Sequence, residues 1–182
     1  MTIPNLITTT RLPLHLFTVI LLYIHPLSSF LVYLINIALD KADGIYARKH
    51  NQITDFGKYY DIAVDRTIQT TILLLLIVYS SSNSIHFYFF LLILTRDFLL
   101  TGIRQFAAAK SVFLKGSIYG KSKAAFEMAA IYILFLQIIL PDIYSNILSN
   151  LTTISLFLTV AVGILSLYKY IKNNYKLLSQ NW

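Results

Sequence analysis

The acidic residues of the chain gather in one stretch, residues 40–65, which reads DKADGIYARKHNQITDFGKYYDIAVD. It holds five of the eight acidic residues, and four of them have helical spacing. Asp40 and Asp43 would lie about 60° apart around a helix axis and about 4.5 Å apart along it. Asp61 and Asp65 are one turn apart at i and i+4. Two helices joined by a short loop would bring these two carboxylate pairs face to face.

Four carboxylates held together need a compensating positive charge. Like charges repel, so concentrating them where water is partly excluded is unfavourable unless cations neutralise them. The chain contains no cysteine, and its four histidines show no ligand spacing. Ligands that are carboxylates alone suit hard divalent ions such as Mg2+ or Mn2+. A pair of these ions is a common device for displacement at phosphorus, which makes such chemistry the first hypothesis for this stretch.

The rest of the chain is strongly apolar. Of its 182 residues, 57% are hydrophobic and 13% are charged, and the mean hydropathy is +0.66. This composition excludes an ordinary soluble domain and indicates a multi-pass membrane protein. We expect one membrane domain, residues 1–182.

Six apolar segments follow one another, and most approach the roughly 20 residues that a helix needs to cross a bilayer. Residues 1–12 mix apolar and polar side chains and are expected to form a short amphipathic helix at the membrane interface. The predicted fold is therefore all-α, with six transmembrane helices and a short N-terminal interfacial helix. The segments are residues 12–24, 27 into the acidic stretch, 61–79, 85–109, 121–140 and 147–170.

The net charge of +7 comes from basic residues that recur between the apolar segments. That pattern is typical of membrane topology and speaks against nucleic acid as a partner. In a six-span arrangement the basic residues fall on one side, at Arg11, in 41–58, in 110–123 and in the tail after 168. The positive-inside rule then predicts a protein of the inner (cytoplasmic) membrane with both termini and the acidic stretch in the cytoplasm.

The acidic stretch resembles the signature of the CDP-alcohol phosphatidyltransferases, D-x2-D-G-x2-A-R-x8-G-x3-D-x3-D. Helix capping and surface ion pairs could explain any one of the aspartates, but not eight positions in register. Two neighbours depart from the common family pattern, Ile62 in place of proline and Arg66 in place of lysine. The matching positions are Asp40, Asp43, Gly44, Ala47, Arg48, Gly57, Asp61 and Asp65.

The resemblance implies that an acceptor hydroxyl attacks the phosphorus of a CDP-linked lipid and that CMP leaves. It implies two metal ions bound by the four aspartates, with Asp65 also the candidate general base. The remaining signature positions are assigned to the CDP-lipid: Gly44 and Ala47 give the nucleotide room, Arg48 contacts the diphosphate, and Gly57 lets the chain enter the next helix without a clash.

Three further stretches resemble the bacterial phosphatidylglycerophosphate synthases of this family: IPNLITTTRL at the start, RDFLLTGIR at 96–104 and GKSKAAFEM at 120–128. They imply CDP-diacylglycerol and glycerol 3-phosphate as substrates, and the family implies a homodimer. A basic pocket for the acceptor phosphate would comprise Arg104, Lys121 and Lys123. Serine, inositol phosphate or phosphatidylglycerol stay open as acceptors. A cation transporter is a further alternative, although it would need its acids near the bilayer centre and would leave Gly44 and Ala47 unexplained.

Charged residues inside the predicted spans have two interpretations. Arg96 and Asp97 lie near mid-depth, where a charge costs about 2.5–3.5 kcal/mol, so they should face the protein interior. They form either structural ion pairs or part of a functional site. Glu127 stands where the family usually has an amide and could pair with Lys123 one turn earlier, which would weaken that lysine as a phosphate ligand. Polar residues such as Asn36, Gln69 and Gln137 are expected to form interhelical hydrogen bonds.

Overall fold

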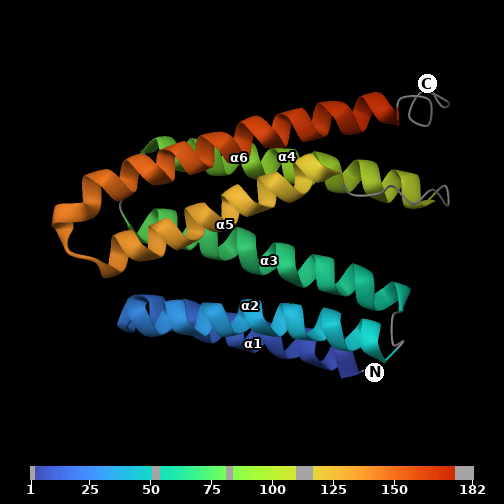
Figure 1. Ribbon diagram of the computed structural model, residues 1–182, viewed down its shortest axis with the longest axis horizontal. Coiled ribbons are helices and arrows are strands. Elements are labelled where there is room, and N and C mark those ends of the chain that lie inside the picture. The colour runs from blue at the N-terminus through green and yellow to red at the C-terminus, as the bar shows by residue number, and fades with distance from the viewer. Residues whose placement is uncertain (1–2, 51–53, 81–83, 110–116, 175–182) are drawn as a thin grey trace. The chain divides into compact units, whose positions relative to one another are not determined.

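The computed structural model of the protein describes residues 3–50, 54–80, 84–109 and 117–174. Within these ranges the chain is helical apart from short turns, so the predicted all-α class is confirmed (Figure 1). The basic residues of 110–116 and of the tail beyond 174 lie outside the described residues. The elements in chain order are α1 Ile3–Ile24, α2 Pro26–Lys49, α3 Asp55–Tyr79, α4 Ser84–Ala109, α5 Ile118–Ile139, the 3-10 helix η1 Asp142–Tyr144, and α6 Ser145–Asn173.

Five segments in the described ranges are long and apolar enough to cross a membrane. The helix α2 is not among them, because its second half carries the charged residues of the acidic stretch. Large apolar side chains remain exposed on the long helices, for example Leu16 at 65% and Phe98 at 71%, as contact with lipid would require. The protein is accordingly a multi-pass membrane protein. The five segments are Pro4–Ile24, Tyr59–Tyr79, Ser84–Ala107, Ile118–Ile139 and Asp142–Asn173.

The predicted interfacial helix and the first predicted span form one continuous helix, α1. Three consecutive threonines lie where a boundary was expected, and their hydroxyls donate to backbone carbonyls one turn earlier: Thr8 to Pro4, Thr9 to Asn5 and Thr10 to Ile7. Threonines bonded in this way satisfy their polar groups inside a helix and do not end it. The first span thereby gains the length that residues 12–24 lack.

The chain divides into two compact units, residues 1–76 and 77–182. In the first unit α1 and α2 pack side by side and run in opposite directions (Figure 1). The turn between them is fixed by His25, whose Nδ1 accepts from the Ser28 backbone N–H at 3.3 Å, and by Pro26 at the first helical position. Farther along the pair, the Ser29 hydroxyl donates to the Thr18 carbonyl at 2.8 Å. The N-terminal end of α1 thus lies beside the C-terminal end of α2.

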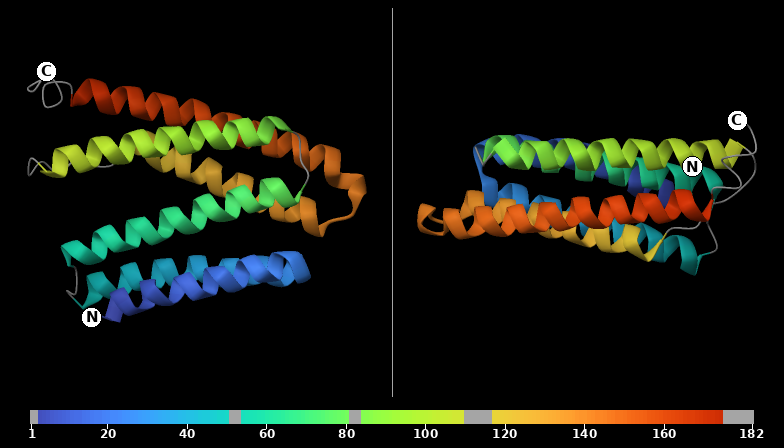
Figure 2. Two further views of the ribbon diagram at one scale, coloured as in Figure 1. Left: turned by 180° about the vertical axis from the view of Figure 1, so that it is seen from behind. Right: turned by 90° about the horizontal axis from the view of Figure 1, so that it is seen from above.

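The second unit is a bundle in which α6 packs against both α4 and α5 (Figure 2). The chain leaves α5 before Pro141, forms η1 and enters α6. The start of α5 is capped by the Ser117 hydroxyl, which accepts from the Gly120 N–H at 3.1 Å. Leu134 and Phe135 of α5 and Leu156 of α6 are fully buried in this unit.

Candidate active site

Three of the four predicted aspartates converge in the first unit. Asp40 and Asp43 of α2 and Asp61 of α3 each offer a carboxylate oxygen, and these oxygens lie within 4.8 Å of one another. We call this group the carboxylate cluster. The helices extend farther than predicted, since α2 continues to Lys49 and α3 begins at Asp55. The cluster therefore lies more than one turn inside both helices, and it brings the predicted pair on α2 together with one member of the predicted pair on α3.

Asp65, the fourth aspartate, is not a member of this group. Its two carboxylate oxygens both accept from the Gln69 Nε2 at 3.0 Å, one turn along the same helix. The prediction of an interhelical bond for Gln69 is therefore wrong, because i and i+4 side chains meet on one helix face. Asp65 is half-buried on α3, and its roles as metal ligand and as base stay predictions.

Arg11 of α1 lies at the centre of the carboxylates. Its Nη1 is 2.5 Å from Asp40 and 3.2 Å from Asp61, and its Nη2 is 3.5 Å from Asp65. The side chain is only 2% exposed. One guanidinium therefore contacts carboxylates from both α2 and α3.

Asn36 of α2 holds this arginine in place through two hydrogen bonds. The Arg11 Nε donates to Asn36 Oδ1 at 3.2 Å, and Asn36 Nδ2 donates back to the Arg11 carbonyl at 3.0 Å. The prediction that Asn36 forms an interhelical hydrogen bond is confirmed. The pair fixes both the backbone and the side chain of Arg11 against α2.

Thr8 orients the last member of the cluster. Its hydroxyl lies 2.9 Å from Asp43 Oδ2 and 3.1 Å from the Pro4 carbonyl, so its one hydrogen is shared between two acceptors, and both Thr8 and Asp43 are buried. Thr8 and Arg11 are three residues apart and so occupy one face of α1. The sequence pattern indicated Arg11 only as a charge that sets membrane topology, and it gave no signal for Thr8. The signal that could have found Arg11 is a charged residue at the edge of a candidate span, where an ionic partner is required.

A pocket of about 290 Å³ opens beside the cluster, entirely within the first unit. Its wall includes all four residues predicted to contact the CDP-lipid, Gly44, Ala47, Arg48 and Gly57. Asp43 and Asp61 line it as well, and α1 contributes Pro4, Asn5 and Thr8. Six of the eight signature positions thus line one pocket, and the other two, Asp40 and Asp65, contact Arg11.

The two glycines of the pocket are explained differently. A Cβ on Gly57 would lie 2.6 Å from Asn5 Oδ1 and 2.8 Å from Thr54 Oγ1, so the close approach of α1 to the start of α3 requires a residue without a side chain. A Cβ on Gly44 would meet only the Arg48 guanidinium, at 3.7 and 3.8 Å. These are ordinary van der Waals distances, so no described residue requires glycine at this position, and the room it gives a nucleotide stays a prediction.

The second unit contains a buried ionic network of its own. Arg96 donates to Asp97 at 2.8 Å and to Ser166 at 2.9 Å, and Lys123 donates to both Asp97 and Glu127 at 2.8 Å. Lys123 is 1% and Glu127 2% exposed. This is the pairing of Lys123 with Glu127 that the sequence allowed, and it favours the structural interpretation of Arg96 and Asp97.

The three residues predicted to bind the acceptor phosphate have different surroundings. Lys123 donates two of its three ammonium hydrogens to the carboxylates of Asp97 and Glu127. Arg104 stands over the Tyr170 ring, 5.7 Å from its centroid, and its buried Nε has no hydrogen-bond partner in the described part of the chain. Lys121 is exposed. Acceptor binding by these residues stays a prediction.

The carboxylate cluster fits the predicted divalent ions by the chemistry of its donors. Its three ligand groups are oxygens from carboxylates, as Mg2+ and Mn2+ prefer. Arg11 supplies one positive charge to several aspartates, so most of their negative charge is not balanced by Arg11 and could be balanced by other cations. The neighbouring pocket is wide enough to admit a small phosphate-containing group.

The fold and the site define a class of protein: a helical membrane protein whose carboxylates lie together beside a pocket. The family profile described as CDP-alcohol phosphatidyltransferase matches residues 1–168, and the chain belongs to this family. The family predicted from the signature and the predicted kind of enzyme, a phosphatidyltransferase, are confirmed.

Three relatives illustrate the match. A Rickettsia typhi protein named CDP-diacylglycerol–glycerol-3-phosphate 3-phosphatidyltransferase is 33% identical over 180 residues, which covers 93% of this chain and 95% of that protein. A Bacillus subtilis protein of the same name is 25% identical and covers 84% and 76%. A Schizosaccharomyces pombe protein named CDP-diacylglycerol–inositol 3-phosphatidyltransferase is 42% identical over 64 residues, 35% of this chain and 27% of its own.

Proposed function

We propose that the protein transfers a phosphatidyl group from CDP-diacylglycerol to sn-glycerol 3-phosphate, forming phosphatidylglycerophosphate and CMP. The observation that carries the chemistry is the carboxylate cluster beside a pocket lined by the other signature positions. The relatives named for a glycerol 3-phosphate acceptor match along most of the chain, whereas the inositol-named relative matches over 35% of it. That difference favours glycerol 3-phosphate over inositol as the acceptor.

In this proposal Asp40, Asp43, Asp61 and Asp65 hold two Mg2+ or Mn2+ ions. Bound there, the ions would offset the negative charge that develops on the diphosphate oxygens as the bond to phosphorus breaks. Arg48, exposed at the pocket wall, has the planar fork that suits a diphosphate oxygen.

Asp65 takes the proton from the acceptor hydroxyl in the proposed reaction. The acceptor oxygen forms a bond to the phosphorus that bears the diacylglycerol, and the bond from that phosphorus to the bridging oxygen of the diphosphate breaks. The bridging oxygen leaves with the electron pair as part of CMP. Gln69, bonded to both oxygens of Asp65, keeps the carboxylate oriented.

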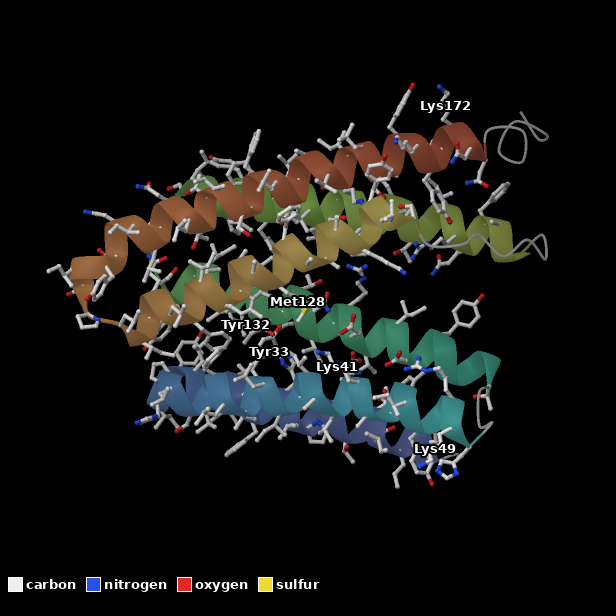
Figure 3. The ribbon with its side chains drawn as sticks, in the orientation of Figure 1. Tyr33, Lys41, Lys49, Met128, Tyr132 and Lys172 are labelled. Atoms are coloured by element: carbon white, nitrogen blue, oxygen red, sulfur yellow. The ribbon has the colours of Figure 1, made fainter. Side chains whose placement is uncertain are left out.

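The phosphate of the acceptor is assigned to Arg104, Lys121 and Lys123. Replacing Lys121 by alanine is expected to raise the KM for glycerol 3-phosphate about tenfold, since a charge-assisted bond to phosphate contributes roughly 1.5–3 kcal/mol. Steady-state kinetics at saturating CDP-diacylglycerol measure this. The matched control is Lys172→Ala at the end of α6 (Figure 3), an exposed lysine outside the proposed pocket. Equal KM values for both variants would show that Lys121 does not bind the acceptor phosphate.

The proposal includes the arrangement in the cell. Basic residues on one side of the predicted spans support an inner-membrane protein with its termini and active site in the cytoplasm. The family match runs across both compact units, which supports one catalytic domain. A homodimer is proposed from the family resemblance alone.

The test is CMP release by the purified protein in detergent, supplied with CDP-diacylglycerol and Mn2+ or Mg2+. Glycerol 3-phosphate, serine, inositol phosphate and phosphatidylglycerol are offered in turn, each with and without a chelator. We expect release with glycerol 3-phosphate only, and its loss on chelation. Release with another acceptor would overturn the acceptor assignment but keep the aspartates, and release with none would revive a cation-binding role without catalysis.

A further inference from the structure

Arg11 is a charged side chain within a membrane-length helix, and the proposed reaction gives it no task. It lies in the candidate span Pro4–Ile24 and is 2% exposed. A charge in such a place is unfavourable unless it is paired, and its partner points to its role. The partners of Arg11 are three of the four aspartates proposed to bind metal, Asp40, Asp61 and Asp65.

We propose that Arg11 is the resident counter-cation of the carboxylates: its guanidinium holds the aspartates of α2 and α3 together before metal arrives and competes with the ion for their oxygens. The inference rests on the proposed metal dependence. It makes Arg11 a positioning residue, because it acts through the aspartates rather than on substrate.

The geometry supports competition for the same atoms. The Arg11 Nη1 contacts Oδ1 of Asp40 and Oδ1 of Asp61, two members of the carboxylate cluster. A divalent ion that binds these Oδ1 atoms must displace that nitrogen or share the oxygens with it, and an ion bound through the Oδ2 atoms of the same carboxylates would still lie close to the guanidinium. At such separations the repulsion between a guanidinium and a divalent ion is large even at an effective dielectric constant of about 20.

Loss of Arg11 would also remove a brace, so two effects oppose each other. The aspartates would repel more strongly and could spread apart, which would weaken metal binding. Other contacts limit this spreading, because the Thr9 hydroxyl of α1 lies 3.2 Å from the Tyr60 hydroxyl of α3, and α1 and α2 stay packed along their length. Competition should therefore outweigh the loss of the brace, and metal should bind more tightly without Arg11.

The test compares wild type with Arg11→Gln, a substitution that removes the charge and retains hydrogen-bonding atoms. Mn2+ binding in the absence of substrate is measured by electron paramagnetic resonance, and thermal unfolding is followed with and without Mn2+. We expect R11Q to bind Mn2+ at least about tenfold more tightly. We also expect it to unfold at a lower temperature without metal and to regain most of that loss when Mn2+ is added, because the ion replaces the missing charge.

Lys49→Gln is the matched control, since it removes one positive charge from an exposed position at the end of α2 (Figure 3). Its Mn2+ affinity should stay within about twofold of wild type, as screened surface charges contribute little. If R11Q does not fold without metal, Asn36→Leu serves as a second variant. It keeps the arginine but removes the amide that fixes it, and it should shift the Mn2+ affinity in the same direction by a smaller factor.

The outcomes separate this inference from the proposed function. If wild type binds Mn2+ and R11Q binds it no more tightly, the inference is overturned and the metal centre stays intact. The same conclusion follows if Mn2+ does not restore the stability of R11Q. Failure of wild type, R11Q and N36L alike to bind Mn2+ would overturn the metal centre and the inference with it.

Discussion

Replacement of Asp65 by asparagine is expected to lower kcat by about 10²–10⁴-fold, the usual contribution of a positioned general base. Asparagine has nearly the shape of aspartate and can still accept a hydrogen bond from Gln69, whose amide lies 3.0 Å from the carboxylate oxygens. It cannot take a proton from the acceptor hydroxyl. Binding of CDP-diacylglycerol should change only a few-fold, because the pocket wall contains other signature residues and not Asp65. Turnover and equilibrium binding of the CDP-lipid measure the two effects separately.

Two controls decide whether the loss belongs to proton transfer. Asp142→Asn makes the same chemical change at an exposed residue of the second unit and should leave kcat unchanged. A Mn2+ titration of the Asp65 variant distinguishes a base from a ligand, since excess metal can refill a weakened site but cannot replace a proton acceptor. Recovery of wild-type turnover at high Mn2+ would make Asp65 a metal ligand only, and unaltered turnover would remove it from the mechanism.

The helices of this protein could be predicted from the sequence because membrane-length apolar segments are a signal carried by the chain itself. Their ends could not be predicted as well. The break expected near residue 12 is absent because threonine hydroxyls bond to carbonyls of their own helix. The acidic stretch was expected to begin near the end of one helix, yet α2 continues to Lys49. Arg48 and Lys49 lie in its last turn, where positive side chains interact favourably with the negative end of the helix dipole.

The aspartates could be predicted because each pair is local, separated by three or four residues. The residues that surround them could not, because only packing brings them near. Arg11 is 50 residues from Asp61 and Thr8 is 35 from Asp43 along the chain. Neither distance produces a periodic pattern, and threonine and arginine near a span have ordinary roles as well. Gln69 shows the opposite error, since a polar residue in a span was assigned to a distant partner while its acceptor lay one turn away.

Replacement of Lys123 by methionine is expected to destabilise the second unit by about 3 kcal/mol, the low end of the cost of breaking a buried ion pair. Asp97 and Glu127 both accept from the Lys123 ammonium at 2.8 Å, so their carboxylates lie close together and would repel without it. Methionine keeps the length of the side chain, which limits the loss of packing. Thermal unfolding in detergent measures the change. Lys121→Met, an exposed residue two positions earlier, makes the same substitution and should have little effect on unfolding.

The same variants decide between the structural and the acceptor-binding interpretation of Lys123. If the network is structural, adding Glu127→Gln to Lys123→Met should restore part of the lost stability, because it removes one of the two repelling charges. The two substitutions would then be strongly non-additive, as residues in direct contact are. If Lys123 instead serves the acceptor, Lys123→Met should leave unfolding unchanged and raise the KM for glycerol 3-phosphate. The third ammonium hydrogen makes a combined role chemically possible, and in that case stability and KM would change together, with Glu127→Gln rescuing the first and not the second.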